Sequence, residues 1–261
     1  LAGVVGVGFV GCLLWMRYMQ PTGSPVAQEE DRPVFDTSIE STPIAEFLRD
    51  TEGLRKQMDD LVGRFDAGED DEEILRGGAA SVARLKEWRK RMPKPAPVHF
   101  GRNQNVNALA IKEFGFVVLM GQRQDYSNFG MYFVKEGDGL RLDWEASEGF
   151  SEVLPGEIPA LTDREPRMMR VLVNGSNFYT DPYPQERYQC YTLQHRDPVD
   201  YVWGFAERGS EVDLRLRERA LRADLWGREH RAIVKVRRGG EGSRPNQVEV
   251  VEVLAQEWIV P

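Results

Sequence analysis

Cysteine and histidine are scarce in this chain of 261 residues. It has two cysteines, Cys12 and Cys190, and three histidines, at positions 99, 195 and 230. Because Cys12 falls in an apolar segment and Cys190 is the one other cysteine, a disulfide framework is excluded. The H-E-x-x-H and C-x-x-C spacings of metal sites and the G-x-S-x-G element of serine hydrolases do not occur. The sequence therefore predicts no metal site and no nucleophilic catalysis.

Charge is missing from the first sixteen residues. Residues 1–19 read LAGVVGVGFVGCLLWMRYM, and Arg17 is the first charged residue. A helix of this length spans roughly 28 Å, which is close to the ~30 Å hydrocarbon core of a bilayer. Trp15, Arg17 and Tyr18 would then lie at the membrane interface, where aromatic rings and snorkelling cations are common. We expect a transmembrane helix over 1–19, with the lipid bilayer as its partner.

Two other patterns in this segment lack the context they need. Gly6, Gly8 and Gly11 spell the G-x-G-x-x-G turn of dinucleotide-binding folds, but only five residues precede Gly6 and no second strand follows. The run Phe9 to Cys12 resembles a lipoprotein cleavage site, yet four apolar residues continue beyond the cysteine. Small residues four apart favour close helix–helix approach instead. The segment thus predicts no cofactor, and it allows helix-mediated self-association.

The membrane-proximal part is strongly acidic. Between Glu29 and Glu73 there are 16 acidic and 5 basic residues. Residues 20–41 are rich in Pro, Gly, Ser and acidic residues, which predicts a flexible acidic linker. Few basic residues follow the anchor, so the positive-inside rule favours a soluble part outside the cytoplasm, on the periplasmic side of the inner membrane.

Helical periodicity follows the linker. Apolar residues recur at near-helical spacing from Ile44 to Phe65, after Thr42-Pro43 as a candidate N-cap and first helical position. A second helix is expected from about Asp71 to Arg91, where Pro93, Pro95 and Pro97 stop it. Residues 42–97 are therefore predicted to form a helical hairpin that either packs on the following domain or stands as a stalk.

Residues 98–261 show short strands separated by turn signals. We expect one α+β soluble domain with a mostly antiparallel curved sheet and one or two helices, including a helix over 210–226. The predicted strands are 114–120, 131–135, 140–146, 168–173, 188–194, 201–206, 232–237 and 248–254.

Asp143 and Glu145 form the one candidate pair of catalytic carboxylates. Strand alternation would place both on one face, roughly 6.5–7 Å apart along the chain. Such a pair can act on a glycosidic bond. The alternative is the solvent-facing side of a half-buried strand, because Leu140, Leu142 and Trp144 occupy the other face.

Aromatic residues are unusually dense between Phe178 and Phe205. Eight fall within 28 residues, interleaved with prolines. They predict either the domain core or a binding surface for a glycan, a peptide or a protein. The candidate binding residues are Tyr188, Tyr191, Tyr201 and Trp203. Tyr188 and Tyr191 differ in parity and so point to opposite faces of the predicted strand.

A basic stretch follows the aromatic cluster. Between Arg208 and Arg244 there are 11 basic and 6 acidic residues. The acids are interspersed and no nucleic-acid-binding motif occurs, so this pattern indicates a salt-bridged surface rather than a nucleic-acid partner.

Several short motifs resemble a group of uncharacterised single-pass membrane-anchored proteins of environmental bacteria. They are LDWEAS at 142–147, FY at 178–179, YQCY at 188–191, WGF at 203–205 and RGS at 208–210. The resemblance implies that anchor, stalk and α+β domain recur as a unit, and it implies no activity. The sequence predicts a non-enzymatic interaction or assembly module with a protein partner. The alternative is a cell-envelope polymer hydrolase that uses Asp143 and Glu145 beside an aromatic groove.

Overall fold

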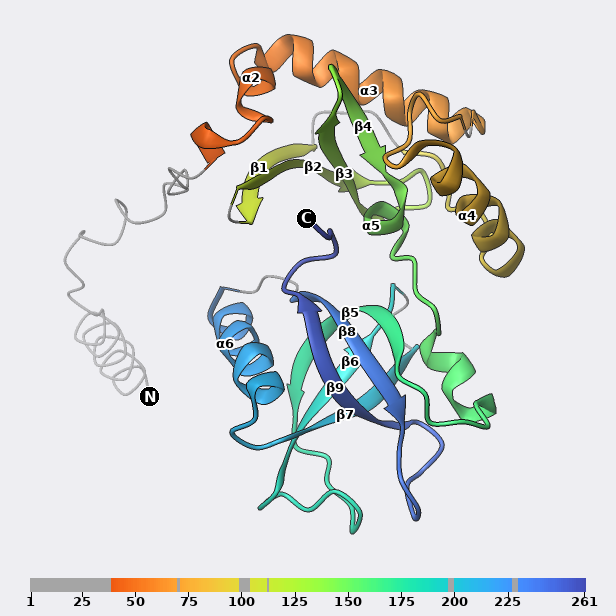
Figure 1. The fold of residues 1–261 in the computed structure, drawn as a ribbon, viewed down its shortest axis with the longest axis vertical. Coiled ribbons are helices and arrows are strands. Elements are labelled where there is room, and N and C mark those ends of the chain that lie inside the picture. Colours follow the sequence, from red (N-terminus) through yellow and green to blue (C-terminus); the bar gives the residue numbers. More distant parts are fainter. Residues whose placement is uncertain (1–38, 70, 99–103, 112, 197–199, 227–229) are drawn as a thin grey trace, which may run out of the picture. The chain divides into compact units, whose positions relative to one another are not determined.

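Two β-sheets and a helical hairpin are the main units in the described part of the chain, which also contains shorter helices and the helix α6. The computed structural model describes residues 39–69, 71–98, 104–111, 113–196, 200–226 and 230–261 (Figure 1). Leu1–Met19, including Trp15, Arg17 and Tyr18, lies outside the described residues, as does most of the linker. Among the residues that are described, no helix has both the length and the apolar character needed to span a membrane.

The hairpin consists of α3 (Thr51–Ala67) and α4 (Gly78–Arg91). The helix expected from Thr42 is interrupted, because two residues separate the short α2 (Ala45–Leu48) from α3; a 3₁₀ turn, η1 (Ile39–Ser41), precedes Thr42. Asp50 starts a new helix: its side chain accepts a hydrogen bond from the Gly53 amide at 2.8 Å. Thr42 does not cap a helix, since its hydroxyl donates to the Ile39 carbonyl at 2.7 Å.

The first sheet is antiparallel, with the order β1-β2-β3-β4. Its strands are β1 (Asn105–Ile111), β2 (Phe114–Gln122), β3 (Asn128–Glu136) and β4 (Gly139–Asp143). One face packs against α3 and α4 in a continuous apolar core, so the hairpin is packed on the sheet (Figure 1). The opposite face, with Phe116 and Tyr132, packs against Trp258 and Ile259 near the C-terminal end.

The second sheet closes into a five-stranded barrel, with the order β5-β6-β7-β9-β8. Its strands are β5 (Arg167–Ser176), β6 (Tyr188–Gln194), β7 (Tyr201–Glu207), β8 (Arg231–Arg238) and β9 (Gln247–Ala255). All pairs are antiparallel except β7 with β9. The helix α6 (Glu211–Trp226) joins β7 to β8, as the sequence predicts for 210–226. Valines and leucines such as Val171, Leu193 and Val234 fill the barrel.

The predicted α+β class and the mostly antiparallel pairing are confirmed. The strands are divided between two sheets rather than joined in one curved sheet. The strand predicted over 140–146 was too long: β4 ends at Asp143, and α5 (Trp144–Glu148) follows directly. Asp143 causes the change, since its carboxylate accepts a hydrogen bond from the Ala146 amide at 2.9 Å and caps the helix.

Candidate functional site

Aromatic side chains gather on the outer surface of β6 and β7. Val202 and Ala206 point into the barrel core, so Tyr201, Trp203 and Phe205 point outward by strand alternation. The connection between β5 and β6 folds over part of this surface. Its Tyr183 stacks on Phe205 with a ring-centroid distance of 4.1 Å and an interplanar angle of 7°. A small apolar cluster therefore forms outside the barrel.

Tyr183 also fixes two loops to each other. Its hydroxyl accepts a hydrogen bond from the Gly240 amide at 3.2 Å and donates to the Glu249 carboxylate at 3.2 Å. Gly240 belongs to the connection between β8 and β9. Burial raises the pKa of Tyr183, so the phenol stays protonated and keeps this donor. The β5–β6 and β8–β9 connections are thereby held side by side.

A second set of rings stays partly open to solvent. Phe178 stacks on Trp203 at 4.1 Å, and Tyr201 meets Trp203 edge-on at 5.4 Å. Tyr201 is 38% exposed, and Phe178 and Trp203 are half-buried. The exposed Arg244 places its guanidinium 5.4 Å from the centre of the Phe178 ring. We call Phe178, Tyr201, Trp203 and Arg244 the aromatic strip.

The four predicted binding residues do not form one surface. Tyr201 and Trp203 are in the aromatic strip, and Tyr188 lies half-buried against Tyr183 at 5.1 Å. Tyr191 is only 1% exposed and belongs to the barrel core, where its hydroxyl donates to Asp213 at 2.8 Å. Its opposite parity to Tyr188 explains this placement, so Tyr191 is corrected to a core residue.

Phe178 and Arg244 were not among the predicted binding residues. Phe178 lies outside any strand, in a connection interrupted by Pro182 and Pro184, so strand alternation says nothing about it. Arg244 lies 66 positions further along the chain. Only the closure of the barrel brings the two connections together.

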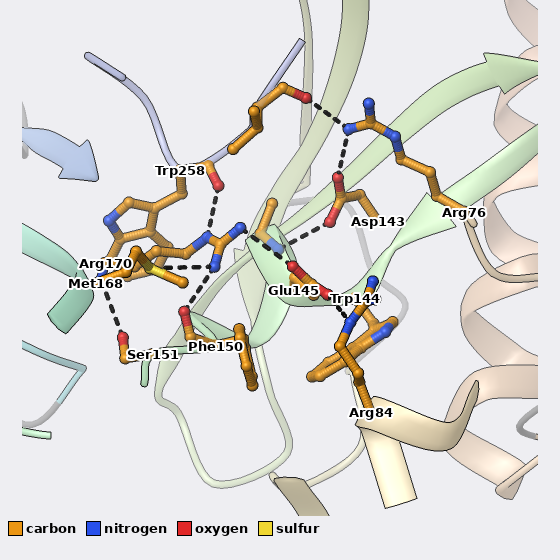
Figure 2. Close-up of polar contacts among 12 residues, drawn as sticks. Arg76, Arg84, Asp143, Trp144, Glu145, Phe150, Ser151, Met168, Arg170 and Trp258 are labelled. Atoms are coloured by element: carbon orange, nitrogen blue, oxygen red, sulfur yellow. Dashed lines mark hydrogen bonds and ion pairs between the residues drawn. The ribbon is translucent and has the colours of Figure 1, made fainter. Parts of the chain in front are cut away.

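Asp143 and Glu145 lie at the end of the first sheet, and Figure 2 shows arginines around both. Asp143 pairs with Arg76 at 2.9 Å in addition to capping α5. Glu145 pairs with Arg84 at 2.7 Å, and its other oxygen lies 3.6 Å from Arg170. The two carboxylates therefore do not share a strand face. The structure places them with these arginines and not with the aromatic strip.

Arg170 is the most enclosed of these arginines. It is 2% exposed, its Nε donates to the Trp258 carbonyl at 2.7 Å, and its Nη1 donates to the Phe150 carbonyl at 2.6 Å (Figure 2). Burial lowers the pKa of Arg170, while the charges of Asp143 and Glu145 oppose that shift. These contacts connect β5, α5 and the C-terminal segment. Arg170 and its partners therefore form a structural junction, and we call this group of contacts the junction.

An open groove of about 400 Å³ runs along α4 and is lined in part by Arg84, Trp88, Arg91 and Phe150. Trp88 meets Phe150 edge-on at 5.3 Å and is itself buried. Arg84 pairs with Glu145, and Arg91 pairs with Glu157 at 2.7 Å. The other charged residues of its lining, Glu87 and Lys90, pair with each other at 2.6 Å, so every charged side chain of the groove already has an ion-pair partner.

Cys190 and His195 are both enclosed. Burial raises the pKa of Cys190 to about 11, so its thiol is a poor nucleophile. His195 is buried, and its Nε2 lies 2.8 Å from the Gly149 carbonyl. Within the described ranges, no group of three or more His, Cys, Asp and Glu side chains is arranged to hold a metal ion.

No family model, no curated protein and no solved structure matches this chain. The aromatic strip is therefore assessed on its own geometry.

Proposed function

We propose that the chain is a non-enzymatic interaction module that binds a protein partner through the aromatic strip. The observation that carries this proposal is the partial exposure of the strip. Tyr201 and Trp203 lie on a strand whose neighbouring residues are buried, and they remain open to solvent beside Phe178 and Arg244. Trp, Tyr and Arg are the residues that dominate the binding energy of protein interfaces.

The ring geometry favours a polypeptide over a sugar. One face of Trp203 is covered by Phe178, and Tyr201 stands at 90° to it, so no broad flat platform is left for a pyranose ring. Ring edges and an arginine suit the side chains and carbonyl groups of a protein. Five-stranded Greek-key barrels of the OB type bind oligonucleotides and oligosaccharides on their second and third strands and adjoining loops. The strip occupies the equivalent strands β6 and β7, so the analogy of fold supports a binding role for this surface, while the choice of a polypeptide rests on the ring geometry.

Site-specific crosslinking tests this proposal. A photoreactive amino acid at position 201 should crosslink the full-length chain to a partner in native membranes. Trp203→Ala should reduce that yield at least tenfold, because an interface hot spot contributes about 2 kcal/mol or more. Tyr126→Ala is the matched control, since Tyr126 is an aromatic residue that is 83% exposed in the β2–β3 turn. Equal yields from wild type and Trp203→Ala would refute the proposal.

We further propose that residues 1–19 anchor the chain in the inner membrane, with the remainder on the periplasmic side. The support is the length and apolar character of this segment and its flanking Trp15, Arg17 and Tyr18. Deleting residues 1–19 should move the chain from the membrane fraction to the soluble fraction. Protease added outside intact spheroplasts should digest the tethered domain, whereas protection from it would place the domain in the cytoplasm.

The alternative of an envelope-polymer hydrolase gains no support from the carboxylate geometry. Asp143 caps a helix and pairs with Arg76, and Glu145 pairs with Arg84. A retaining or inverting hydrolase needs two carboxyl groups that face a shared substrate. If Asp143→Asn abolished hydrolysis of an envelope polymer by the folded chain, the alternative would replace the interaction module.

A further inference from the structure

Among the described residues, the first sheet has one edge, formed by β1, that no other strand covers. Its other edge is covered, because β4 pairs in parallel with the segment at Leu75: the Arg76 amide donates to the Leu142 carbonyl at 2.9 Å, and the Leu142 amide donates to Ile74 at 2.8 Å. The second sheet is a closed barrel. Among the described strands, β1 is thus the one whose outer side faces no partner strand.

The pairing register shows which backbone groups of β1 point outward. Two residues connect β1 to β2, and Ile111 faces Phe114 across this hairpin. In such a hairpin the closing residues bond to each other, so Asn107, Leu109 and Ile111 direct their backbone groups toward β2. The N–H and C=O groups of Val106, Ala108 and Ala110 therefore point away from the sheet. No hydrogen bond between described residues occupies these six groups.

β1 also lacks the devices that protect an edge strand. Its sequence, NVNALAI, contains no charge, proline or glycine, and its register with β2 has no bulge. Natural proteins usually block exposed edges with such features. Val106 and Leu109 are 40% and 41% exposed, so apolar side chains accompany the outward-facing backbone groups.

We propose that β1 pairs with β1 of a second copy of this chain, forming an antiparallel dimer with one continuous eight-stranded sheet. With Ala108 on the twofold axis, Val106 faces the partner's Ala110 and Asn107 faces the partner's Leu109. No two charged side chains meet, because the strand has none. About six interchain hydrogen bonds form between the outward groups. This pairing is independent of the aromatic strip.

Proline at position 108 tests the pairing. Ala108→Pro removes an outward N–H, and edge strands tolerate proline where the N–H faces away from the sheet. In light scattering of the full-length chain in detergent, wild type should be dimeric, and Ala108→Pro should dissociate at least tenfold more readily. Tyr126→Ala is the control, because Tyr126 is 83% exposed in the β2–β3 turn and lies outside β1, and this variant should remain dimeric. Unchanged protection of the Asn107 and Leu109 amides would show that the proline variant is folded.

Two further measurements locate the contact. The amides of Val106, Ala108 and Ala110 should exchange with solvent deuterium more slowly as protein concentration rises. Ala108→Cys should form an interchain disulfide on mild oxidation, since hydrogen-bonded partners lie about 5.5 Å apart between Cα atoms. Tyr126→Cys is the exposed control that should not crosslink. A monomer at all concentrations, or a dimer that survives Ala108→Pro with fast exchange at all three amides, would overturn the proposal.

Discussion

At the scale of single residues, Arg170 holds three segments together. Its guanidinium donates to the Phe150 and Trp258 carbonyls and lies near the Glu145 carboxylate, while its backbone belongs to β5. Burying a guanidinium costs free energy that only well-formed partners offset. Stability should therefore fall if Arg170 loses its partners, because its charge would be buried without compensation. Stability should also fall if Arg170 is replaced, because the two carbonyls would lose their donor.

Replacing Arg170 with methionine should be strongly destabilising. Arg170→Met keeps much of the volume but leaves two carbonyls without a donor and removes a cation from Glu145. We expect the free energy of unfolding to fall by about 3–5 kcal/mol. Arg167→Met is the control, because Arg167 makes a part-exposed ion pair with Asp163, and it should cost at most about 1 kcal/mol. Denaturant titration measures both. A loss below 1 kcal/mol for Arg170→Met would show that the junction is not important for stability.

His195 should make stability depend on pH. Burial is the main cause that lowers the pKa of His195 in the folded chain, so the unfolded chain binds a proton more readily. Stability should therefore decrease as pH falls below about 6.5, the usual pKa of an unfolded histidine. His195→Gln, which keeps a donor for the Gly149 carbonyl, should flatten this dependence between pH 7 and 5. Burial raises the pKa of Glu148, so this group makes stability increase as pH falls. Both proteins contain Glu148, so its contribution cancels when the stability of His195→Gln is subtracted from that of wild type. Parallel curves for the two proteins would contradict the assignment.

At the scale of secondary structure elements, α5 shows why local pattern misled the prediction at 140–146. Alternation of Leu140, Leu142 and Trp144 fits a strand, but Asp143 is both the last residue of β4 and the N-cap of α5. β1 was missed for a related reason, since NVNALAI has few β-branched or aromatic residues. The strands at 114–120, 188–194 and 201–206 were found because short runs rich in apolar, aromatic and β-branched residues are bounded there by turn signals. Hydrophobic patterns thus predict where a helix or strand lies, but they predict poorly the residue at which it ends.

Substitutions at Asp143 therefore test whether this residue acts as the N-cap of α5. Asp143→Ala removes both the bond to the Ala146 amide and the ion pair with Arg76, and should lower the free energy of unfolding by about 1–2 kcal/mol. Asp143→Asn retains an oxygen that can accept from the amide, so its loss should be smaller. Chemical denaturation followed by circular dichroism distinguishes the two variants. Equal stability of the alanine variant and wild type would exclude a capping role.

At the scale of the whole molecule, neither the barrel nor the aromatic strip could be predicted from sequence. Closure requires the parallel pair Trp203 with Gln247 and the pairing of Arg167 with Val236, which join positions far apart in the chain. Local periodicity contains no information on such partners. The strip combines β7 with connections near Phe178 and Arg244, so it exists only once the barrel closes. The aromatic density was visible in the sequence, but which rings stay exposed was not.

The C-terminal segment provides the apolar contact between the first sheet and the barrel. Trp258 packs in one cluster with Phe116 and Tyr132 of the sheet and with Leu172 of the barrel, and its indole N–H donates to the Val171 carbonyl at 3.0 Å. Beside it, the Tyr132 hydroxyl donates to Glu257 at 2.6 Å and accepts from Arg231. Trp258 thus contacts both the first sheet and the barrel.

Trp258→Ala should separate the unfolding of the sheet from that of the barrel. Removing the indole leaves a cavity, at a cost of about 3–5 kcal/mol. Because that cost falls on the contact between the two sheets, amide exchange should show two groups of opening free energies where wild type shows one. Val260→Ala is the control, since Val260 is 47% exposed, and it should leave exchange unchanged. If Trp258→Ala still opened as one cooperative unit, the arginine and tyrosine hydrogen bonds would be sufficient to couple the sheets, and the C-terminal tryptophan would be filling space rather than joining them.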